Sequence, residues 1–214
     1  MRWLLMFLLL SSQAWSAPLT PEQRKELFSN ATKRLKGTEI EKRAPQVGDV
    51  FPDLVIGGKK VSLWTKDAPI VLSFYRGGWC PYCVKQLKEL SQNLNEFRPA
   101  TVIAVSPETQ QEVQKTRRKN DLKMVLVADK NNELARSLGL AFKVEDAVAQ
   151  EYKALGVDLQ ASQGNADNIL PVPATFVIGR DLRVAYMFAD ADYTQRAALP
   201  DIVKTVERML KPAP

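Results

Sequence analysis

The chain contains two cysteines, Cys80 and Cys83, which are separated only by Pro81 and Tyr82. Two thiols at this C-x-x-C spacing can close a small disulfide ring and open it again, so the spacing predicts thiol–disulfide chemistry. The same motif forms half of a zinc knuckle, but the second half is missing from this chain. A passive structural disulfide is a further alternative, although so small a ring removes little chain entropy and would be a weak staple.

Composition argues against several other kinds of chemistry. The 214 residues include no histidine, which rules out Ser-His-Asp and Cys-His catalysis and, with only two cysteines, leads us to expect no metal site. No glycine-rich phosphate loop follows a strand, so no nucleotide, flavin or other cofactor is expected. Lys and Arg number 30 against 24 Asp and Glu. Because no basic block is interleaved with aromatic residues, nucleic acid is not an expected partner.

The elements around the two cysteines predict different roles for them. Residues 70–75 form a nearly continuous apolar run typical of a buried strand, and apolar residues recur at helical spacing from Pro81 onward. Cys80 is therefore expected at the helix N-cap, with Pro81 at the first helical position. Free backbone N–H groups and the positive helix end would lower the pKa of Cys80 below the free value of about 8.5. Cys83 lies one turn further along and is more shielded, which suits a resolving thiol.

Two segments precede the main domain. Residues 1–16 combine a positive start, a short apolar run and a small-residue cleavage site after Ser16, which is typical of a signal peptide; an uncleaved anchor is the alternative. Residues 17–43 are expected to form an amphipathic helix over residues 20–35, capped by Thr20, and then a polar linker. The mature protein would be exported, to the periplasm in a Gram-negative bacterium, with no membrane attachment after cleavage.

Residues 44–211 predict one α/β domain with three layers, because strands and helices alternate in its first half and a hairpin plus a helix closes it. Residues 141–168 fit this pattern poorly; a helix over 144–155 and a polar loop over 160–168 are the best interpretation. The expected strands are residues 55–56, 61–63, 70–75, 101–105, 124–128, 174–178 and 184–188. One helix is expected to begin at Pro81. Further helices are expected over residues 108–120, 132–138 and 200–210.

The stretch around the cysteines resembles the active site of the thioredoxin superfamily, in which a strand, a Trp-Cys motif and a helix follow one another. Residues 47–210, most of the chain, resemble the peroxiredoxin branch of that superfamily (the alkyl hydroperoxide reductase and thiol-specific antioxidant group). The chain is most similar to a subgroup with a Phe-Tyr-Arg-Gly-Gly-Trp-Cys-Pro-Tyr-Cys run. The matching segments are residues 47–54, 74–83, 104–106 and 174–178.

This resemblance implies a thioredoxin fold, with a central mixed β-sheet flanked by helices and a peroxiredoxin-like N-terminal extension. It also implies that Cys80 and Cys83 form the catalytic redox pair. The residues expected to shape the site around them are Arg76, Gly77, Gly78, Trp79, Pro81, Tyr82 and Pro173.

Three positions depart from the peroxiredoxin pattern. The family's Pro and Thr, seven and three residues before the attacking cysteine, are Ser73 and Gly77 here, and its Arg before the Ala-Thr-Phe strand is Pro173. The Thr helps to hold the peroxide and the Arg lowers the cysteine pKa, so these helpers are missing from their usual positions. Arg76 either replaces the missing Arg as a positive charge beside Cys80 or is solvated. Lys85 would also lower the pKa of Cys80 if it lies near. Pro173 either matches the cis-proline of thioredoxins or is an ordinary trans proline.

Three functions remain open from the sequence. The leading one is a thiol-dependent peroxidase that reduces hydrogen peroxide or alkyl hydroperoxides, with a thioredoxin-like protein or a small thiol as electron donor. The alternative is a disulfide oxidoreductase that exchanges thiols with protein disulfides, which the Trp-Cys-Pro-Tyr-Cys motif favours. The third is a non-catalytic binding module, which would tolerate Cys80→Ser. The oligomeric state also remains open.

Overall fold

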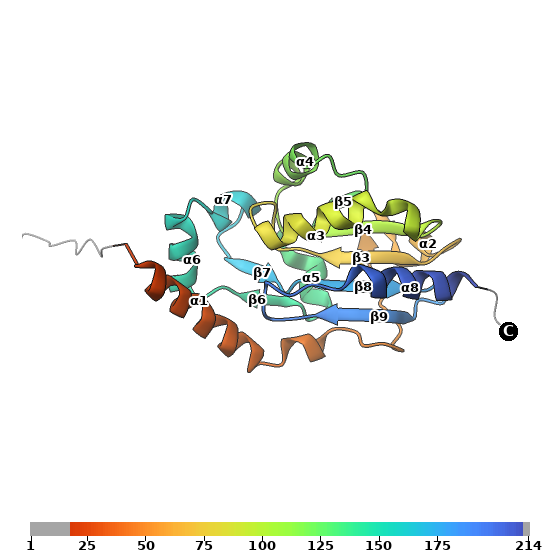
Figure 1. Cartoon of the computed structure of the whole chain (residues 1–214), viewed down its shortest axis with the longest axis horizontal. Coiled ribbons are helices and arrows are strands. Elements are labelled where there is room, and N and C mark those ends of the chain that lie inside the picture. Colours follow the sequence, from red (N-terminus) through yellow and green to blue (C-terminus); the bar gives the residue numbers. More distant parts are fainter. Residues whose placement is uncertain (1–17, 212–214) are drawn as a thin grey trace, which may run out of the picture.

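The computed structural model describes residues 18–211, which are built around a five-stranded mixed sheet (Figure 1). Its strands are β3 (Ile70–Phe74), β4 (Thr101–Ser106), β5 (Val125–Ala128), β8 (Ala174–Ile178) and β9 (Val184–Ala189). The spatial order is β5-β4-β3-β8-β9. β3, β4 and β5 run parallel to one another, whereas β8 is antiparallel to both β3 and β9. The predicted mixed sheet of a thioredoxin fold is therefore confirmed.

The central strand β3 is buried on both faces, as its apolar sequence predicts. Val71 and Tyr75 face a core shared with α3 (Pro81–Gln92) and α8 (Leu199–Leu210), which lie along one side of the sheet (Figure 1). Ile70 and Leu72 face the other core, which is shared with α5 (Glu133–Ser137) and with the chain that leads into the domain. Helices therefore flank the sheet on both sides, and the redox pair sits where β3 leads into α3.

The predicted N-terminal helix is present as α1 (Pro21–Lys36). Thr20 Oγ1 accepts from the Gln23 backbone N–H and Gln23 Oε1 accepts from that of Thr20, which completes the expected capping box. α1 packs on α6 (Asp146–Ala154) through an ion pair of Arg24 with Glu151 and through ring contacts. A 3₁₀ turn, η1 (Ile40–Arg43), then follows in the segment that we expected to be a linker.

The prediction of a strand at residues 61–63 is wrong, because these residues begin the short helix α2 (Val61–Trp64). The carboxylate of Asp53 accepts hydrogen bonds from the backbone N–H and the hydroxyl of Ser62, at 2.8 and 2.9 Å, and so caps the first turn. The strand that pairs with β1 (Val55–Ile56) is instead β2 (Lys59–Lys60). A tertiary cap therefore outweighs the local strand pattern.

The segment that resisted sequence analysis, residues 141–168, contains three elements, a strand and two helices, and leads into a second strand. β6 (Ala141–Lys143) pairs antiparallel with β7 (Ile169–Pro171) and is followed by α6, which lies within the helix expected over residues 144–155. The loop expected over residues 160–168 is partly wrong, because its first residues belong to α7 (Leu159–Gln163). The Asp158 side chain accepts from the Ala161 N–H at 3.0 Å and caps α7.

The remaining elements connect these layers. They are α4 (Gln110–Lys119) and the 3₁₀ turns η2 (Leu94–Phe97) and η3 (Lys130–Asn132). Val113 of α4 belongs to the core that α3 and α8 share. The expected signal peptide, residues 1–16, lies outside the described residues. Between residues 18 and 211, no helix is long and apolar enough to cross a bilayer.

Candidate active site

The structure places Cys80 at the N-cap of α3, as predicted. Its backbone is extended (φ −86°, ψ 116°), Pro81 occupies the first turn, and the Cys80 carbonyl accepts from the Val84 N–H at 3.0 Å. The Cys80 N–H in turn donates to the Gly77 carbonyl at 3.1 Å, which closes the turn between β3 and α3. Both cysteines are free thiols, with exposed fractions of 2% for Cys80 and 0% for Cys83.

The pKa values of the two thiols are shifted in opposite directions. The hydrogen bond from the Cys83 thiol, the charges of Arg76 and Arg196 and the Cys83 backbone N–H lower the pKa of Cys80 to about 5, against the opposing effect of burial. Burial, together with the hydrogen bond and charge of Cys80, raises the pKa of Cys83 well above its ordinary value. At neutral pH the pair is therefore a thiolate beside a thiol. The division into an attacking and a resolving sulfur stays a prediction.

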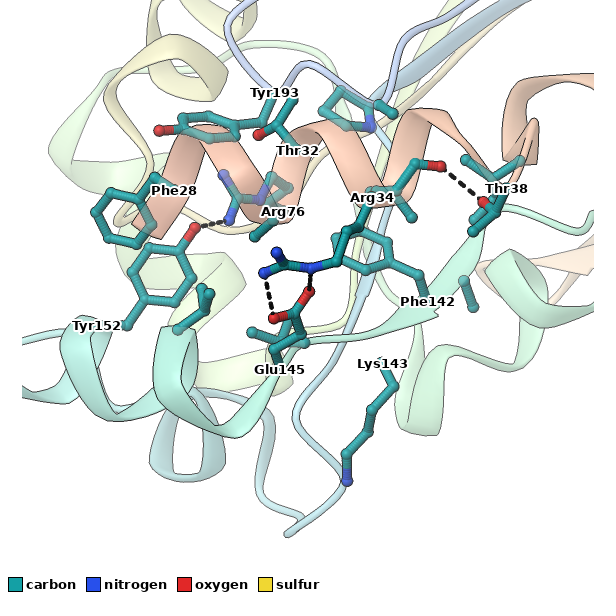
Figure 2. Close-up of a pocket in the computed structure, with 18 of the residues that line it drawn as sticks. Phe28, Thr32, Arg34, Thr38, Arg76, Phe142, Lys143, Glu145, Tyr152 and Tyr193 are labelled. Carbon is teal, nitrogen blue, oxygen red and sulfur yellow. Dashed lines mark hydrogen bonds and ion pairs between the residues drawn. The ribbon is translucent and has the colours of Figure 1, made fainter. Parts of the chain in front are cut away.

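Arg76 is a buried cation rather than a solvated one, with an exposed fraction of 3%. Its guanidinium lies over three aromatic rings, with the carbon 4.5 Å from the centroid of Tyr193, 5.1 Å from Trp79 and 5.4 Å from Tyr152. Its Nη2 also donates a hydrogen bond to the Tyr152 hydroxyl (Figure 2). Arg76 therefore supplies positive charge beside Cys80, whereas Lys85 is exposed.

A second cation, Arg196, reaches the site from the loop between β9 and α8 and was not predicted. Its Nη2 lies 3.0 Å from the Sγ of Cys83. Its Nη1 donates to the carbonyls of Tyr193 and Gln195, both at 2.6 Å, which holds the guanidinium in place. No local motif marks this arginine, because it lies 113 positions after Cys83.

The Gly77-Gly78-Trp79 turn is held by a buried carboxylate that was also not predicted. Glu108 Oε2 accepts from the Gly78 N–H at 2.8 Å and from the Ser106 hydroxyl at 3.2 Å. Burial raises the pKa of Glu108 to about 7, although these hydrogen bonds oppose the shift. Gly78 is required at its position, because a Cβ there would overlap the side chain of Thr116.

Of the two alternatives for Pro173, the structure has the ordinary trans proline and not the cis-proline of thioredoxins. Among residues 18–211 the one cis peptide bond is Arg98–Pro99, so Val172–Pro173 is trans. Only two residues separate β7 from β8, and the Val172 N–H donates to the Leu140 carbonyl at 2.9 Å. This tether keeps the connection extended, which a trans bond suits. Pro173 nevertheless lies beside the site, because it lines the same cavity as Arg76.

The other sequence-derived positions have distinct surroundings. Tyr82 is 44% exposed, and its ring meets that of Tyr193 edge to face at 6.0 Å. Trp79 is half-buried and packs against Tyr152, with 5.5 Å between the ring centroids. Ser73 is buried, and its hydroxyl lies 3.3 Å from that of Thr175, which also accepts from Gln86 of α3.

A cavity of about 410 Å³ opens beside Arg76 (Figure 2). It lies between α1, β6 and α6, and we call it the α1 cavity. Its lining includes Phe28, Ala31, Phe142, Val148, Tyr152 and Tyr193. Within residues 18–211, no three Cys, Asp or Glu side chains gather as metal ligands.

A mixed five-stranded sheet that carries a thiolate and a thiol at the start of a helix defines a thiol-based oxidoreductase of the thioredoxin superfamily. Residues 47–187 match the model of the AhpC/TSA family. The chain therefore belongs to the AhpC/TSA family, and it is an enzyme of the peroxiredoxin kind. The more specific similarity, to a subgroup with a Trp-Cys-Pro-Tyr-Cys site, stays a prediction.

Solved peroxiredoxins share the fold. Peroxidoxin BcpB from Mycobacterium tuberculosis is 18% identical over 78% of this chain and 99% of its own, with a TM-score of 0.60. A cysteine-to-serine mutant of PrxQ from Xylella fastidiosa is 16% identical over 78% and 98%, with a TM-score of 0.59. A mutant of Peroxiredoxin 6 from Arenicola marina is 19% identical over 76% and 72%, with a TM-score of 0.56. No curated protein matches the chain.

Proposed function

We propose that this protein is a thiol-dependent peroxidase in which Cys80 attacks the peroxide and Cys83 resolves the product. The observation that carries the proposal is the Cys80 thiolate, with a pKa of about 5, in the field of two arginines. A thiolate is the nucleophilic form of cysteine, and fixed positive charge stabilises the oxyanion that leaves when an O–O bond breaks. Arg76 thus serves in place of the family arginine that is Pro173 here.

The chemistry proceeds in two steps that the pair can complete within one chain. The Cys80 thiolate attacks one peroxide oxygen, forming an S–O bond and breaking the O–O bond; the leaving oxygen takes a proton and departs as water or an alcohol. The Cys83 thiol then attacks the sulfenic sulfur, forming the disulfide, and its proton leaves with the hydroxide as water. Two electrons pass from the dithiol to the peroxide, and an external thiol donor returns them.

Burial of the sulfur atoms supports a small oxidant. Cys80 is 2% exposed, so a protein disulfide would need the surrounding side chains to move before its sulfur could be attacked, whereas a peroxide needs much less room. Gly77 supplies no hydroxyl to hold the peroxide, which leaves the Arg76 guanidinium as the nearest cationic donor for it. The electron donor, a thioredoxin-like protein or a small thiol, acts on the oxidised pair.

A disulfide oxidoreductase is the second candidate function, and the closeness of the two thiols favours it. Cys83 already donates a hydrogen bond to Cys80, so a mixed disulfide formed at Cys80 would be released quickly by its neighbour. Tyr82 beside the pair is exposed enough to contact a protein substrate.

One experiment separates these functions. The reduced protein is mixed with hydrogen peroxide in a stopped-flow instrument, and disulfide formation is followed through the fluorescence of Trp79, which adjoins Cys80. We expect oxidation several orders of magnitude faster than that of a free thiol, abolished by Cys80→Ser. Cys83→Ser should retain the first step and stop at sulfenic acid. Slow oxidation beside rapid exchange with a protein disulfide would instead establish the oxidoreductase.

We further propose that the protein is exported, because residues 1–16 have the pattern of a signal peptide. The mature chain would begin at Ala17, just before α1, and would reach the periplasm if the source is Gram-negative. Intact-mass measurement of protein from fractionated cells tests this proposal. A chain that retains Met1 in the cytoplasmic fraction would contradict it.

A further inference from the structure

The α1 cavity has mostly apolar walls and an excess of positive charge. Its apolar lining includes Phe28 and Ala31 on α1, Phe142 on β6 and Val148 on α6. Among its lining residues only Glu145 carries negative charge. The four cationic side chains are Arg34, Arg43, Arg76 and Lys143.

The one carboxylate of the cavity lining, Glu145, is already paired with an arginine. Glu145 receives two hydrogen bonds from Arg34, at 2.8 Å from Nε and 2.6 Å from Nη2, which link α6 to α1 at the cavity wall (Figure 2). Arg43, Lys143 and Arg76 therefore remain without a carboxylate from the cavity lining. An apolar space with this charge excess suits an apolar molecule with one negative end.

Arg76 is the one buried cation of the cavity, and its hydrogen bonding is incomplete. Its Nε is buried without a hydrogen-bond partner among the described residues. No carboxylate between residues 18 and 211 forms an ion pair with it. Its anionic neighbour is the Cys80 thiolate. A buried cation without an anion is costly, so oxidation of Cys80 to a disulfide leaves a charge that a ligand can satisfy.

We propose that the α1 cavity binds an apolar monocarboxylate, of the fatty-acid class, with its carboxylate at Arg76 and its chain between α1 and α6. The disulfide form binds it more tightly than the dithiol form, because the thiolate that competes for Arg76 is gone. The α1 wall of the cavity lies outside residues 47–187, the part of the chain that matches the family model. The redox preference rests on the proposed function, whereas binding itself does not.

Coupling of this kind is reciprocal. A ligand that prefers the disulfide form stabilises that form by the same factor, so the bound carboxylate would make the pair harder to reduce. Free fatty acid in the cavity would then shift the dithiol–disulfide equilibrium of Cys80 and Cys83 toward the disulfide. Arg76 lines the cavity, and its charge also acts on Cys80, so this side chain links the ligand to the thiol site.

The test is calorimetric titration of the purified protein with octanoate, in the dithiol and disulfide forms. We expect saturable binding, with octanol and octylamine at least about tenfold weaker, since a charge-assisted hydrogen bond contributes about that factor. The disulfide form should bind octanoate about three- to tenfold more tightly than the dithiol form. Cys80→Ser, which lacks the thiolate without needing oxidation, should match the disulfide form.

Two variants of α1 locate the ligand. Ala31→Trp fills the cavity and should abolish binding, whereas Ser29→Trp adds the same ring at an exposed position of the same helix and should not. Equal affinity for octanoate and octanol, or unchanged binding in Ala31→Trp, would overturn the site. Equal affinity of Cys80→Ser and the dithiol form would overturn the redox preference alone. If the protein proves not to be a peroxidase, the octanoate–octanol comparison still decides the site.

Discussion

Arg196 Nη2 lies 3.0 Å from the Sγ of Cys83, although 113 residues separate the two along the chain. The charge of Arg76 lowers the pKa of Cys80 more than the charge of Arg196 does. Two guanidiniums therefore act on the pair of sulfurs, one contributed by the strand-to-helix turn and one by the loop before α8. The acidity of the pair depends on both ends of the domain being folded together.

The first prediction concerns the pH dependence of Cys80. Because its pKa is lowered to about 5, it is almost fully thiolate at neutral pH, and its rate of alkylation should be flat above about pH 6 and halve near pH 5. Iodoacetamide labelling followed by mass spectrometry measures this rate.

A matched pair of variants tests the origin of this shift. Cys83→Ser keeps a hydroxyl that can donate to the thiolate and should change the pKa little, whereas Cys83→Ala removes the donor and should raise it. If Cys83→Ala keeps the lowered pKa of Cys80, the hydrogen bond is not the main cause of the shift.

The second prediction ranks the two arginines. Arg76→Gln should raise the pKa of Cys80 by about one unit, since an adjacent opposite charge has at least that effect. Arg196→Gln should raise it less, because its charge contributes less to the Cys80 shift. The same alkylation profile measures both, with Lys85→Gln as a control that removes an exposed cation of α3. An identical profile for Arg76→Gln and the wild type would contradict the role given to Arg76.

The third prediction concerns stability and Glu108. Its pKa is about 7 in the folded protein against an ordinary 4.5, so the unfolded chain ionises first as pH rises. The folded state therefore loses stability between about pH 4.5 and pH 7, by an amount on the order of 3 kcal/mol. Glu108→Gln cannot ionise and still accepts from Gly78, so it should be more stable than the wild type at pH 8 and similar at pH 4.

Urea unfolding at both pH values measures this difference. Glu89→Gln, at an exposed position of α3, serves as the control and should leave the pH profile unchanged. A parallel pH profile for Glu108→Gln and the wild type would show that Glu108 titrates normally in the folded protein.

The fourth prediction concerns the glycine before Trp79. A Cβ on Gly78 would stand 2.9 Å from the Cβ of Thr116 and closer still to its hydroxyl. Gly78→Ala should therefore cost about 1–3 kcal/mol, as overpacking does, and slow peroxide oxidation by displacing the turn that leads to Cys80. Thermal unfolding and the stopped-flow rate measure the two effects.

Thr116→Ala removes the hydroxyl and methyl that the new Cβ would meet. Combined with Gly78→Ala, it should recover part of the lost stability, while Thr116→Ala alone should have the smaller effect. A double variant no more stable than Gly78→Ala would show that the cost arises in the backbone rather than from this contact.

The sequence by itself determined where Cys80 and Cys83 lie and which elements hold them. An apolar strand, a proline at the first helical turn and two thiols one turn apart are all local features, and each came out as predicted in the structure. The capping box of α1 is local in the same way. Hydrogen bonding and apolar spacing within one element suffice to predict such features.

Only the tertiary structure decided what surrounds the thiols. Arg196, Glu108 and Tyr152 come from three different segments, and no spacing in the sequence relates them to Cys80. The chain near Val61 forms a helix whose first turn Asp53 caps, although its local pattern predicts a strand. Long-range contacts outweigh local preference at such points. Arg76 itself was visible in the sequence, but its burial among three rings arose only from folding.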